Sequence, residues 1–506
     1  YLQLVAFSLA ALAMSWQVWA AAAVFAWPAL AKQPEFPGVT CPPWWYAPEK
    51  PQHALQYNGL VDLKPACFNI SADERPHQVY VIGDWGGVLY GTWVAPADHR
   101  SLQFKAHHRQ FVKGVDDLAQ RKVAQSMMDH AALDNLDYVL NVGDNFYWGG
   151  IDATCGRFDQ FDGGKQWQHI YEDMYGGALE GKQWLSVLGN HDWGGWYYLS
   201  AWDQTIAYTW GAPGSKDRWF QPSLYYKTRA IYQADVHKGS AEEGFVVDYF
   251  FVDTNMFDAF DPETDEMHNI CGVSHNAEHK GCAGTGPGNP GECKMWFIRI
   301  WKEQCSWLAG YLEASVLTSD WQIVVTHFPP LWGMDFWQGI TKKYGVDMMI
   351  TGHTHHQQYW RQWNNPLDGT AVIISGGGGG ITSEEVPNEH GWDDEYGFFK
   401  LEMHRNEIIV RMVSHGGQLR KEDRVYQIPP SYHVPDMKVS PVFMPVNVED
   451  ENTKPEVNEH HEKIKAATKG EKVDDLLAQL EAQRLEMMKG QRQLREEPRR
   501  GSENWL

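Results

Sequence analysis

The stretch that most constrains the fold covers residues 141–150 and reads Asn-Val-Gly-Asp-Asn-Phe-Tyr-Trp-Gly-Gly. The apolar run Tyr-Val-Leu at residues 138–140 leads into it and predicts a buried strand. Gly143 allows this strand to end in a tight turn, because glycine lacks the β-carbon that restricts other residues. Asp144 therefore lies at the carboxyl end of a strand, and Tyr147 follows it in the same loop.

Four further junctions between a predicted strand and a glycine- or proline-marked loop also carry polar side chains. They read Gly83-Asp84-Trp85-Gly86-Gly87, Gly189-Asn190-His191-Asp192, Thr326-His327-Phe328-Pro329-Pro330 and Gly352-His353-Thr354-His355. A single junction of this kind is ordinarily just a turn. In an α/β sheet, however, the loops beyond the carboxyl ends of the strands meet in one crevice, so we expect all five junctions to lie together.

These junctions offer a metal a mixed set of donors. The donors are Asp84, Asp144, Tyr147, Asn190, His327, His353 and His355. Carboxylate, phenolate, amide oxygen and imidazole suit a harder transition metal, and the lack of thiolate argues against a structural zinc site. In the Gly-His-x-His junction, both imidazoles fall on the same side of an extended loop and can reach two neighbouring metals. The sequence therefore predicts a two-metal site.

The order of the predicted elements indicates an α/β fold. Strands at 78–82, 138–140, 184–188, 245–251, 321–325 and 347–350 are interspersed with helices at 111–130, 170–179 and 295–316, and strands at 371–374, 398–403 and 407–413 follow. Strands separated by helices, and then a run of strands, are typical of an α/β sandwich. The Gly- and Cys-rich insert at residues 258–292 is expected to be a surface loop.

The two ends of the chain differ in composition from its middle. Residues 2–31 carry no charge and end in Ala-Leu-Ala, so 1–31 is predicted to be a secretory signal peptide, with an uncleaved membrane anchor as the alternative. Residues 32–76 are Pro-rich and form either an ordered extension or a linker. The charged tail at 429–506 contains a predicted helix at 470–496, which is either solvated or docked on the chain itself, or binds a partner.

Composition narrows the range of partners. The chain has 506 residues, of which 43% are apolar, so it can bury a large core. Its formal net charge of −22 argues against nucleic acid as a partner, because a phosphate backbone repels excess negative charge.

The cysteines point to an oxidising compartment. The seven are Cys41, Cys67, Cys155, Cys271, Cys282, Cys293 and Cys305. Their wide spacing favours disulfides over zinc, and the odd number leaves one thiol free or shared with another chain. A Cys41–Cys67 bridge could close the N-terminal extension, but the sequence does not fix the connectivity. Asn69-Ile70-Ser71 is an acceptor for glycosylation in a secreted chain.

The series Gly-Asp-Trp-Gly-Gly, Gly-Asp-Asn-Phe-Tyr-Trp-Gly-Gly, Gly-Asn-His-Asp, Thr-His-Phe-Pro-Pro and Gly-His-Thr-His-His resembles the metallophosphoesterases. Tyr147 narrows the resemblance to the purple acid phosphatases of the small, tartrate-resistant type. The likeness covers about residues 78–425, within a predicted catalytic domain at 77–428. It implies a metallophosphoesterase-like β-sandwich of two mixed sheets flanked by helices.

The resemblance also implies roles for the donors. A ferric ion would be held by Asp84, Tyr147 and His355, a divalent iron, zinc or manganese by Asn190, His327 and His353, and Asp144 would bridge the two. A metal-bound hydroxide would attack phosphorus, and His191 would protonate the leaving alkoxide. Asp192 either orients that imidazole or caps a turn.

Two features near the predicted site depart from simple patterns. In relatives, the loop after the His-x-Pro motif often carries another acid or His near the substrate. In this chain the region reads Asp335-Phe336, so Asp335 is expected to serve as the acid, and the His is missing. The five glycines at 376–380 lack the Lys-Ser/Thr of a phosphate-binding P-loop and are predicted to form a tight loop beside the site.

The resulting prediction is an acid phosphatase that is secreted, lysosomal or vacuolar, or held at the cell surface. Its substrates would be phosphorylated small molecules or phosphoproteins. One alternative is a surface-associated structural or assembly protein, anchored by residues 2–31 and assembled through its tail, that keeps a metallophosphoesterase domain without relying on turnover. Another is a phosphodiesterase with the same metals. The complete set of ligands favours an enzyme over a structural protein.

Overall fold

The computed structural model describes residues 41–71, 75–87, 109–160, 164–234, 243–264, 268–276, 281–282, 285–429, 432–433 and 439. The predicted signal peptide or anchor at 1–31 and the predicted tail helix at 470–496 lie outside these residues. Among the helices that are described, none is long and apolar enough to cross a membrane.

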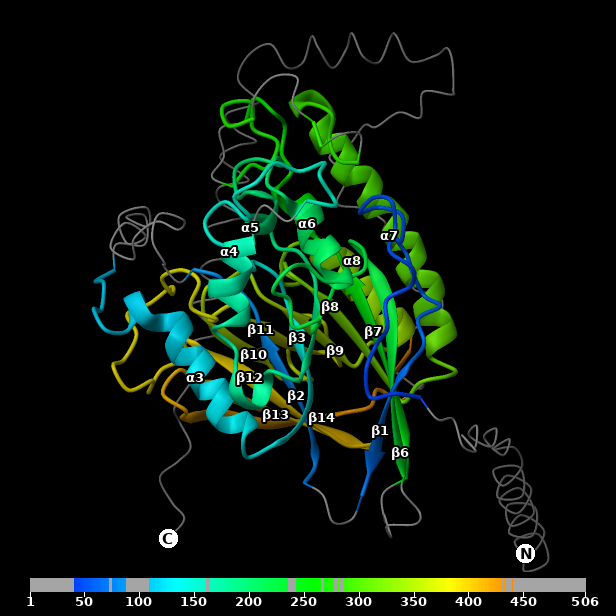
Figure 1. Cartoon of the computed structure of the whole chain (residues 1–506). Coiled ribbons are helices and arrows are strands. Elements are labelled where there is room, and N and C mark those ends of the chain that lie inside the picture. Colours follow the sequence, from blue (N-terminus) through cyan, green and yellow to red (C-terminus); the bar gives the residue numbers. More distant parts are fainter. Residues whose placement is uncertain are drawn as a thin grey trace, which may run out of the picture. The chain divides into compact units, whose positions relative to one another are not determined.

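In this part of the chain, two seven-stranded sheets form the framework of the fold (Figure 1). The first sheet has the order β14 (Leu419–Tyr426), β13 (Glu407–Ser414), β12 (Gly397–Met403), β2 (His77–Ile82), β3 (Asn135–Asn141), β4 (Gln183–Ser186) and β5 (Trp219–Phe220). The second sheet has the order β1 (Ala66–Ile70), β6 (Tyr226–Ala234), β7 (Phe245–Val252), β8 (Trp321–Thr326), β9 (Met348–Thr351), β11 (Ala371–Ser375) and β10 (Gln357–Trp360). Both sheets mix parallel and antiparallel pairs, so the predicted α/β fold with two mixed sheets is confirmed.

The strands that lead to the predicted metal ligands pair in parallel with their neighbours. Strands β2, β3 and β4 pair in parallel in the first sheet, and β7, β8 and β9 do so in the second. Parallel neighbours bring their carboxyl ends to the same edge of a sheet. Each sheet therefore presents its ligand-bearing loops along a single edge.

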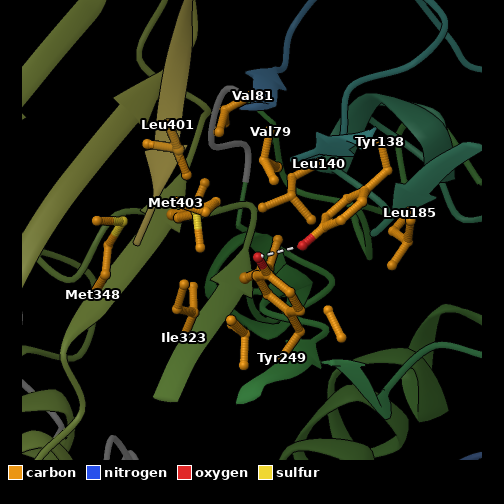
Figure 2. Close-up of a cluster of buried hydrophobic side chains, with 14 of the residues drawn as sticks. Val79, Val81, Tyr138, Leu140, Leu185, Tyr249, Ile323, Met348, Leu401 and Met403 are labelled. Atoms are coloured by element: carbon orange, nitrogen blue, oxygen red, sulfur yellow. Dashed lines mark hydrogen bonds between the residues drawn. The ribbon is translucent and has the colours of Figure 1, made fainter. Parts of the chain in front are cut away.

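The main hydrophobic core lies between the two sheets. Val79 and Val81 of β2 belong to this core, whereas Tyr80 between them belongs to a second cluster that includes residues of α3. This alternation is the period of two that a strand imposes on its side chains. Figure 2 shows apolar side chains of both sheets meeting there, with the hydroxyls of Tyr138 and Tyr249 hydrogen-bonded at 2.7 Å.

Three longer helices flank the sheets: α3 (Ala119–Ala131), α7 (Pro290–Ser315) and α8 (Met334–Tyr344). Helix α3 packs on β12, and α7 packs on β7 and on α8 (Figure 1). Helix α7 begins where the sequence places a strong start signal: the Asn289 side chain accepts a hydrogen bond from the Glu292 amide, and Pro290 occupies the first helical position. The helix predicted at 295–316 is thus confirmed, but it begins at Pro290, within the segment predicted to be a surface loop.

Shorter helical segments connect the strands. They are η2 (Asp116–Leu118), α4 (Gly164–Gln166), η3 (Trp167–Glu172), η4 (Gly177–Leu179), α5 (Asn190–Trp193), α6 (Trp202–Ala207), η5 (Tyr208–Trp210) and η7 (Asn255–Asp258).

The helix predicted at 111–130 is wrong in its first part, because α3 begins only at Ala119. The carboxylate of Asp116 is buried and accepts hydrogen bonds from the Val112 amide at 2.6 Å and from the Arg109 guanidinium at 2.7 and 3.0 Å. Gly114 has φ of 85°, which lies outside helical space. The residues before α3 therefore form a loop and the short 3-10 helix η2 around this buried carboxylate.

The helix predicted at 170–179 is also wrong as a single element. The chain forms η3, which ends at Glu172, and a separate turn, η4. Glu172 is buried and pairs with the buried guanidinium of Arg218 at 3.3 Å. Because this ion pair and Gly176-Gly177 interrupt the pattern, no continuous helix forms there.

The Pro-rich segment before β2 is an ordered extension over its described residues, 41–71. The indole of Trp45 is buried against the Tyr138 ring, with ring centroids 4.9 Å apart, and the Trp45 amide donates to the Gln183 side chain. Strand β1 pairs in parallel with β6, and a disulfide joins Cys41 to Cys67. The alternative of a linker is excluded for these residues.

Two further disulfides fix the insert between β7 and α7. Cys155, in the loop beyond β3, is bonded to Cys282 of the insert, and Cys271 is bonded to Cys293 in the first turns of α7. Cys305 is the one free thiol among the described cysteines, and it is buried. The insert is therefore tied both to the first sheet's loops and to α7.

Candidate metal centre

All seven predicted ligands lie beyond the carboxyl ends of five strands. Asp84 follows β2, Asp144 and Tyr147 follow β3, Asn190 begins α5 after β4, His327 follows β8, and His353 and His355 follow β9. Asp84, Asp144 and His353 have positive φ values of 57°, 52° and 70°. Such values are uncommon outside glycine and cluster at functional sites, where the surrounding structure holds the backbone in place.

Asp144 lies at the centre of the site. Its Oδ2 is 2.7 Å from the Tyr147 hydroxyl, while its Oδ1 is 3.4 Å from Nε2 of His327. The side chain is fully buried, and Oδ1 also accepts a hydrogen bond from the His191 amide at 2.9 Å. The two oxygens of one carboxylate therefore face two different groups of donors.

The first group gathers around Oδ2 of Asp144. The Tyr147 hydroxyl is also 3.2 Å from Oδ1 of Asp84, and Nε2 of His355 is 3.9 Å from that same oxygen. The other Asp84 oxygen accepts a hydrogen bond from the His353 amide at 3.0 Å. This group thus contains Tyr147, His355 and both aspartates.

The second group gathers around the side-chain oxygen of Asn190. Nε2 of His327 lies 3.0 Å from it and Nδ1 of His353 lies 3.2 Å from it. Nδ1 of His327 lies 2.8 Å from the Val142 carbonyl, which can only accept, so this ring nitrogen carries a proton. Nε2 is then the nitrogen that can bind a metal, as is usual when a backbone carbonyl orients the other nitrogen.

The buried charges of this cluster favour cations. Burial raises the pKa of Asp84 well above its usual value, and burial with two neighbouring carboxylates does the same for the pKa of Tyr147. Burial lowers the pKa of His327, but Asp144 outweighs it and raises that pKa to about 10. Donor atoms of Asp84, Asp144 and His327 lie within 4.8 Å of one another. The donor set therefore fits metal ions, since a buried anionic cluster needs compensating positive charge.

His191 lies against the first group. Its ring centroid is 4.4 Å from that of Tyr147, and its Nδ1 donates to the Trp148 carbonyl at 2.6 Å. Asp192 accepts instead from the Gly189 amide at 2.8 Å and from the Asn145 amide at 2.9 Å. Of the two roles open to Asp192, the geometry therefore favours holding the turn over orienting the imidazole.

Asp335 lies apart from these contacts. It is exposed in the first turn of α8. Among the described residues, it makes no hydrogen bond or ion pair with the seven ligands. Its assignment as an acid remains a prediction.

The five glycines at 376–380 form the tight loop that was predicted beside the site. The Gly380 amide donates to the Asp84 carbonyl at 2.8 Å. A β-carbon on Gly380 would lie 2.5 Å from the ring of Tyr147, far inside van der Waals contact. The run thus allows the backbone to approach two of the predicted ligands closely.

Three further residues border the site. The rings of Trp148 and Trp332 lie 4.5 Å from His191 and 5.0 Å from His353, respectively, and His268 lies beside His191. Trp148 stands inside the motif but offers no metal donor. His268 belongs to the insert and stands at no strand end, so no local pattern marked it.

Comparison with known proteins gives this site its class. The model of the calcineurin-like phosphoesterase family matches residues 77–357. This range contains all seven predicted ligands and more than half of the chain. The chain belongs to the calcineurin-like phosphoesterase family.

Individual relatives agree with the narrower resemblance. The chain is 24% identical over 384 residues to tartrate-resistant acid phosphatase type 5 of Rattus norvegicus, covering 70% of this chain and 92% of the relative. The family and this relative together support a phosphatase-type hydrolase.

Solved structures that are similar to this chain include the following two. "GAP50 the anchor in the inner membrane complex of Plasmodium" is 15% identical with a TM-score of 0.44, covering 72% of this chain and 92% of that one. Purple acid phosphatase PPD1 from yellow lupin seeds (Lupinus luteus) is 13% identical with a TM-score of 0.37, covering 73% of this chain and 58% of that one.

Proposed function

We propose that this protein hydrolyses phosphomonoesters at acidic pH with a ferric ion and a divalent iron, zinc or manganese. The observation that carries the proposal is the position of Asp144, whose two oxygens face two separate groups of donors. A bridging carboxylate between two such groups is the arrangement that a pair of neighbouring metals requires.

The donor types assign one metal to each group. Asp84, Tyr147 and His355 would hold the ferric ion, because phenolate and carboxylate oxygens suit a hard trivalent cation. Asn190, His327 and His353 would hold the divalent ion. The combined charge of the two ions exceeds that of two carboxylates and one phenolate, so the site keeps positive charge for a phosphate. When bound, such metals acidify a coordinated water and polarise the phosphoryl group.

His191 would supply the proton that the leaving group needs. Its Nδ1–H donates to the Trp148 carbonyl, so Nε2 holds a proton for the substrate only when the imidazole is doubly protonated. Burial lowers the pKa of His191, so this charged form requires acidic pH. The contact with the Tyr147 ring holds the imidazole next to the predicted ferric site. A positioned acid of this kind contributes to rate most when the departing alcohol is a poor leaving group.

The proposed location is the secretory route, with a secreted, lysosomal or vacuolar, or cell-surface destination. Three disulfides among the described residues support it, because such bonds persist in oxidising compartments. Asn69 of the predicted glycosylation acceptor is exposed. Phosphorylated small molecules or phosphoproteins are the proposed substrates, and the net charge of −22 disfavours nucleic acid.

The proposal is tested by metal analysis, visible absorption and turnover on one purified sample. We expect two metal ions per chain, a visible charge-transfer band, and hydrolysis of p-nitrophenyl phosphate at acidic pH, with Asp144→Asn as the inactive control. Faster hydrolysis of bis(p-nitrophenyl) phosphate would instead identify a phosphodiesterase. A folded protein without metal and without turnover would overturn the proposal and favour a structural role.

A further inference from the structure

The insert between β7 and α7 brings a histidine to the metal centre. The ring centroid of His268 lies 5.3 Å from that of His191 and 5.7 Å from that of Trp148. Its Nδ1 lies 3.5 Å from Nδ2 of Asn190. His268 is half-buried, and it thus stands between the predicted proton donor and a predicted ligand of the divalent metal.

The hydrogen-bond network defines which ring nitrogen of His268 carries a proton. The side-chain oxygen of Asn190 faces His327 and His353, so the amide presents its Nδ2 group to His268. An amide NH₂ can only donate, and Nδ1 of His268 must therefore accept. In the neutral ring the proton then lies on Nε2, which makes Nε2 a hydrogen-bond donor.

The residue that follows His268 is held in place by four hydrogen bonds. The Asn269 side chain is 2% exposed; its oxygen accepts from the amides of Phe260 and Cys271, and its nitrogen donates to the carbonyls of Asp261 and Thr264. Both disulfides of the insert reinforce this position. Preorganised donors of this kind bind a ligand without losing much conformational freedom.

The backbone conformation of His268 resembles that of the ligands themselves. Its φ is 72°, close to the 70° of His353 and in the same region as Asp84 and Asp144. The other non-glycine residues of positive φ in the described chain are Asp or Asn, which adopt this conformation readily. A histidine that is held in the left-handed region beside these ligands is a constraint of the kind found at functional sites.

We propose that His268 binds the phosphate group of the substrate, with its Nε2–H donating to a phosphate oxygen on the divalent side of the site. This inference rests on the proposed function and deepens it. His268 of the insert would then line the substrate site. A phosphate group is the ligand that an N–H donor next to a cationic centre recognises, because a hydrogen bond to an anionic oxygen is charge-assisted.

The test uses orthophosphate as the probe and calorimetry on the metal-loaded protein. His268→Ala should weaken orthophosphate binding by about ten- to a hundredfold, as expected for a lost hydrogen bond to a charged group. His268→Gln should recover part of the affinity, because its amide retains an N–H donor. His275→Ala is the matched control: His275 is an exposed histidine of the same insert that stacks on Trp196, and its loss should leave the affinity unchanged.

Metal content and kinetics complete the test. We expect both metals to remain in His268→Ala and the KM for p-nitrophenyl phosphate to rise more than kcat falls. Unchanged orthophosphate affinity in His268→Ala would overturn the inference, and loss of the divalent metal would assign His268 to positioning Asn190 instead. A wild-type protein that binds orthophosphate through His268 without turning over monoesters would refute the proposed function alone, whereas one that binds no orthophosphate would refute both.

Discussion

The two sheets contribute different chemistry to the metal centre. The first sheet supplies every predicted oxygen donor, through Asp84, Asp144, Tyr147 and Asn190 after β2, β3 and β4. The second sheet supplies every predicted imidazole ligand, through His327, His353 and His355 after β8 and β9. Neither sheet alone offers a metal a complete coordination sphere, so the site exists only where the sheets meet.

Hydrogen bonds also join the ligand-bearing loops of the two sheets directly. His327 of the second sheet donates to the Val142 carbonyl of the first, and the His353 amide donates to Asp84. Each metal in the proposed assignment takes ligands from both sheets. Metal binding would therefore hold the two sheets together. A ligand that binds only the native state also stabilises the protein against unfolding.

The largest effect should come from the bridging carboxylate. Asp144→Asn removes the charge that both groups share, and it should lower kcat/KM by more than about ten-thousandfold, since the metals stabilise the transition state by several kcal/mol. Metal analysis should find both ions weakened. In the matched variant Asn190→Ala, only the divalent ion should be loosened. Full retention of both metals and activity in Asp144→Asn would refute the bridging role.

Metal removal should loosen the sandwich as a whole. Dialysis against a chelator should lower the melting temperature by roughly 5–10 °C, because saturating metal contributes about 4 kcal/mol at a thousandfold excess over its dissociation constant. Calorimetric scans with and without metal measure the shift. In Asp144→Asn the shift should largely disappear; an unchanged melting temperature of the metal-free wild type would show that the sheets hold together without bound metal.

The loss of His191 should depend on the leaving group. His191→Ala should slow hydrolysis of alkyl phosphates by about a hundred- to ten-thousandfold, the usual contribution of a positioned acid, and aryl phosphates far less. The fall in rate with rising pH should also become flatter. Both metals should remain bound, because His191 is no ligand. Equal slowing of both substrate classes would assign His191 to binding phosphate.

Replacing Tyr147 tests one oxygen donor of the first sheet. Tyr147→Phe should abolish the visible band, because the charge transfer needs a phenolate on iron, while the fold stays intact. The neighbouring Trp148→Phe variant should keep the band. An iron-loaded wild type without colour would refute Tyr147 as a ligand.

The smallest effect is expected for Asp335. Its exposed carboxylate makes no hydrogen bond or ion pair with the ligands in the described chain, so Asp335→Asn should lower kcat by less than about tenfold, below the range of a positioned acid. Steady-state rates on alkyl phosphates measure this. A loss equal to that of His191→Ala would restore Asp335 as the acid.

The clustering of the seven predicted ligands could be predicted from sequence because each of their loops is marked locally. Every one follows an apolar strand in a loop that contains a glycine or proline, and parallel strands place such loops together. His268 could not be predicted in this way. Its position depends on disulfides that join Cys155 to Cys282 and Cys271 to Cys293, and sequence spacing does not determine that connectivity.

The same distinction explains the errors in secondary structure. Helix α7 carries its own start signal at Asn289 and Pro290, and its prediction was confirmed. The start of α3 depends on a carboxylate, Asp116, that is buried against Arg109 and Tyr396, and Tyr396 is distant in sequence. Apolar spacing alone does not reveal that this polar contact replaces a helical turn.

The glycine run at 376–380 has a consequence for how the protein tolerates change. A β-carbon on Gly376 or Gly378 would lie 1.9 Å from the Thr354 carbonyl or 2.2 Å from the Gly83 carbonyl, and both of these are backbone atoms that cannot move aside. In a survey of all single substitutions, this run should therefore be as intolerant as the metal ligands, although it contributes no donor. Mutational sensitivity in this protein will reveal the tightly packed backbone around the site as clearly as the metal donors themselves.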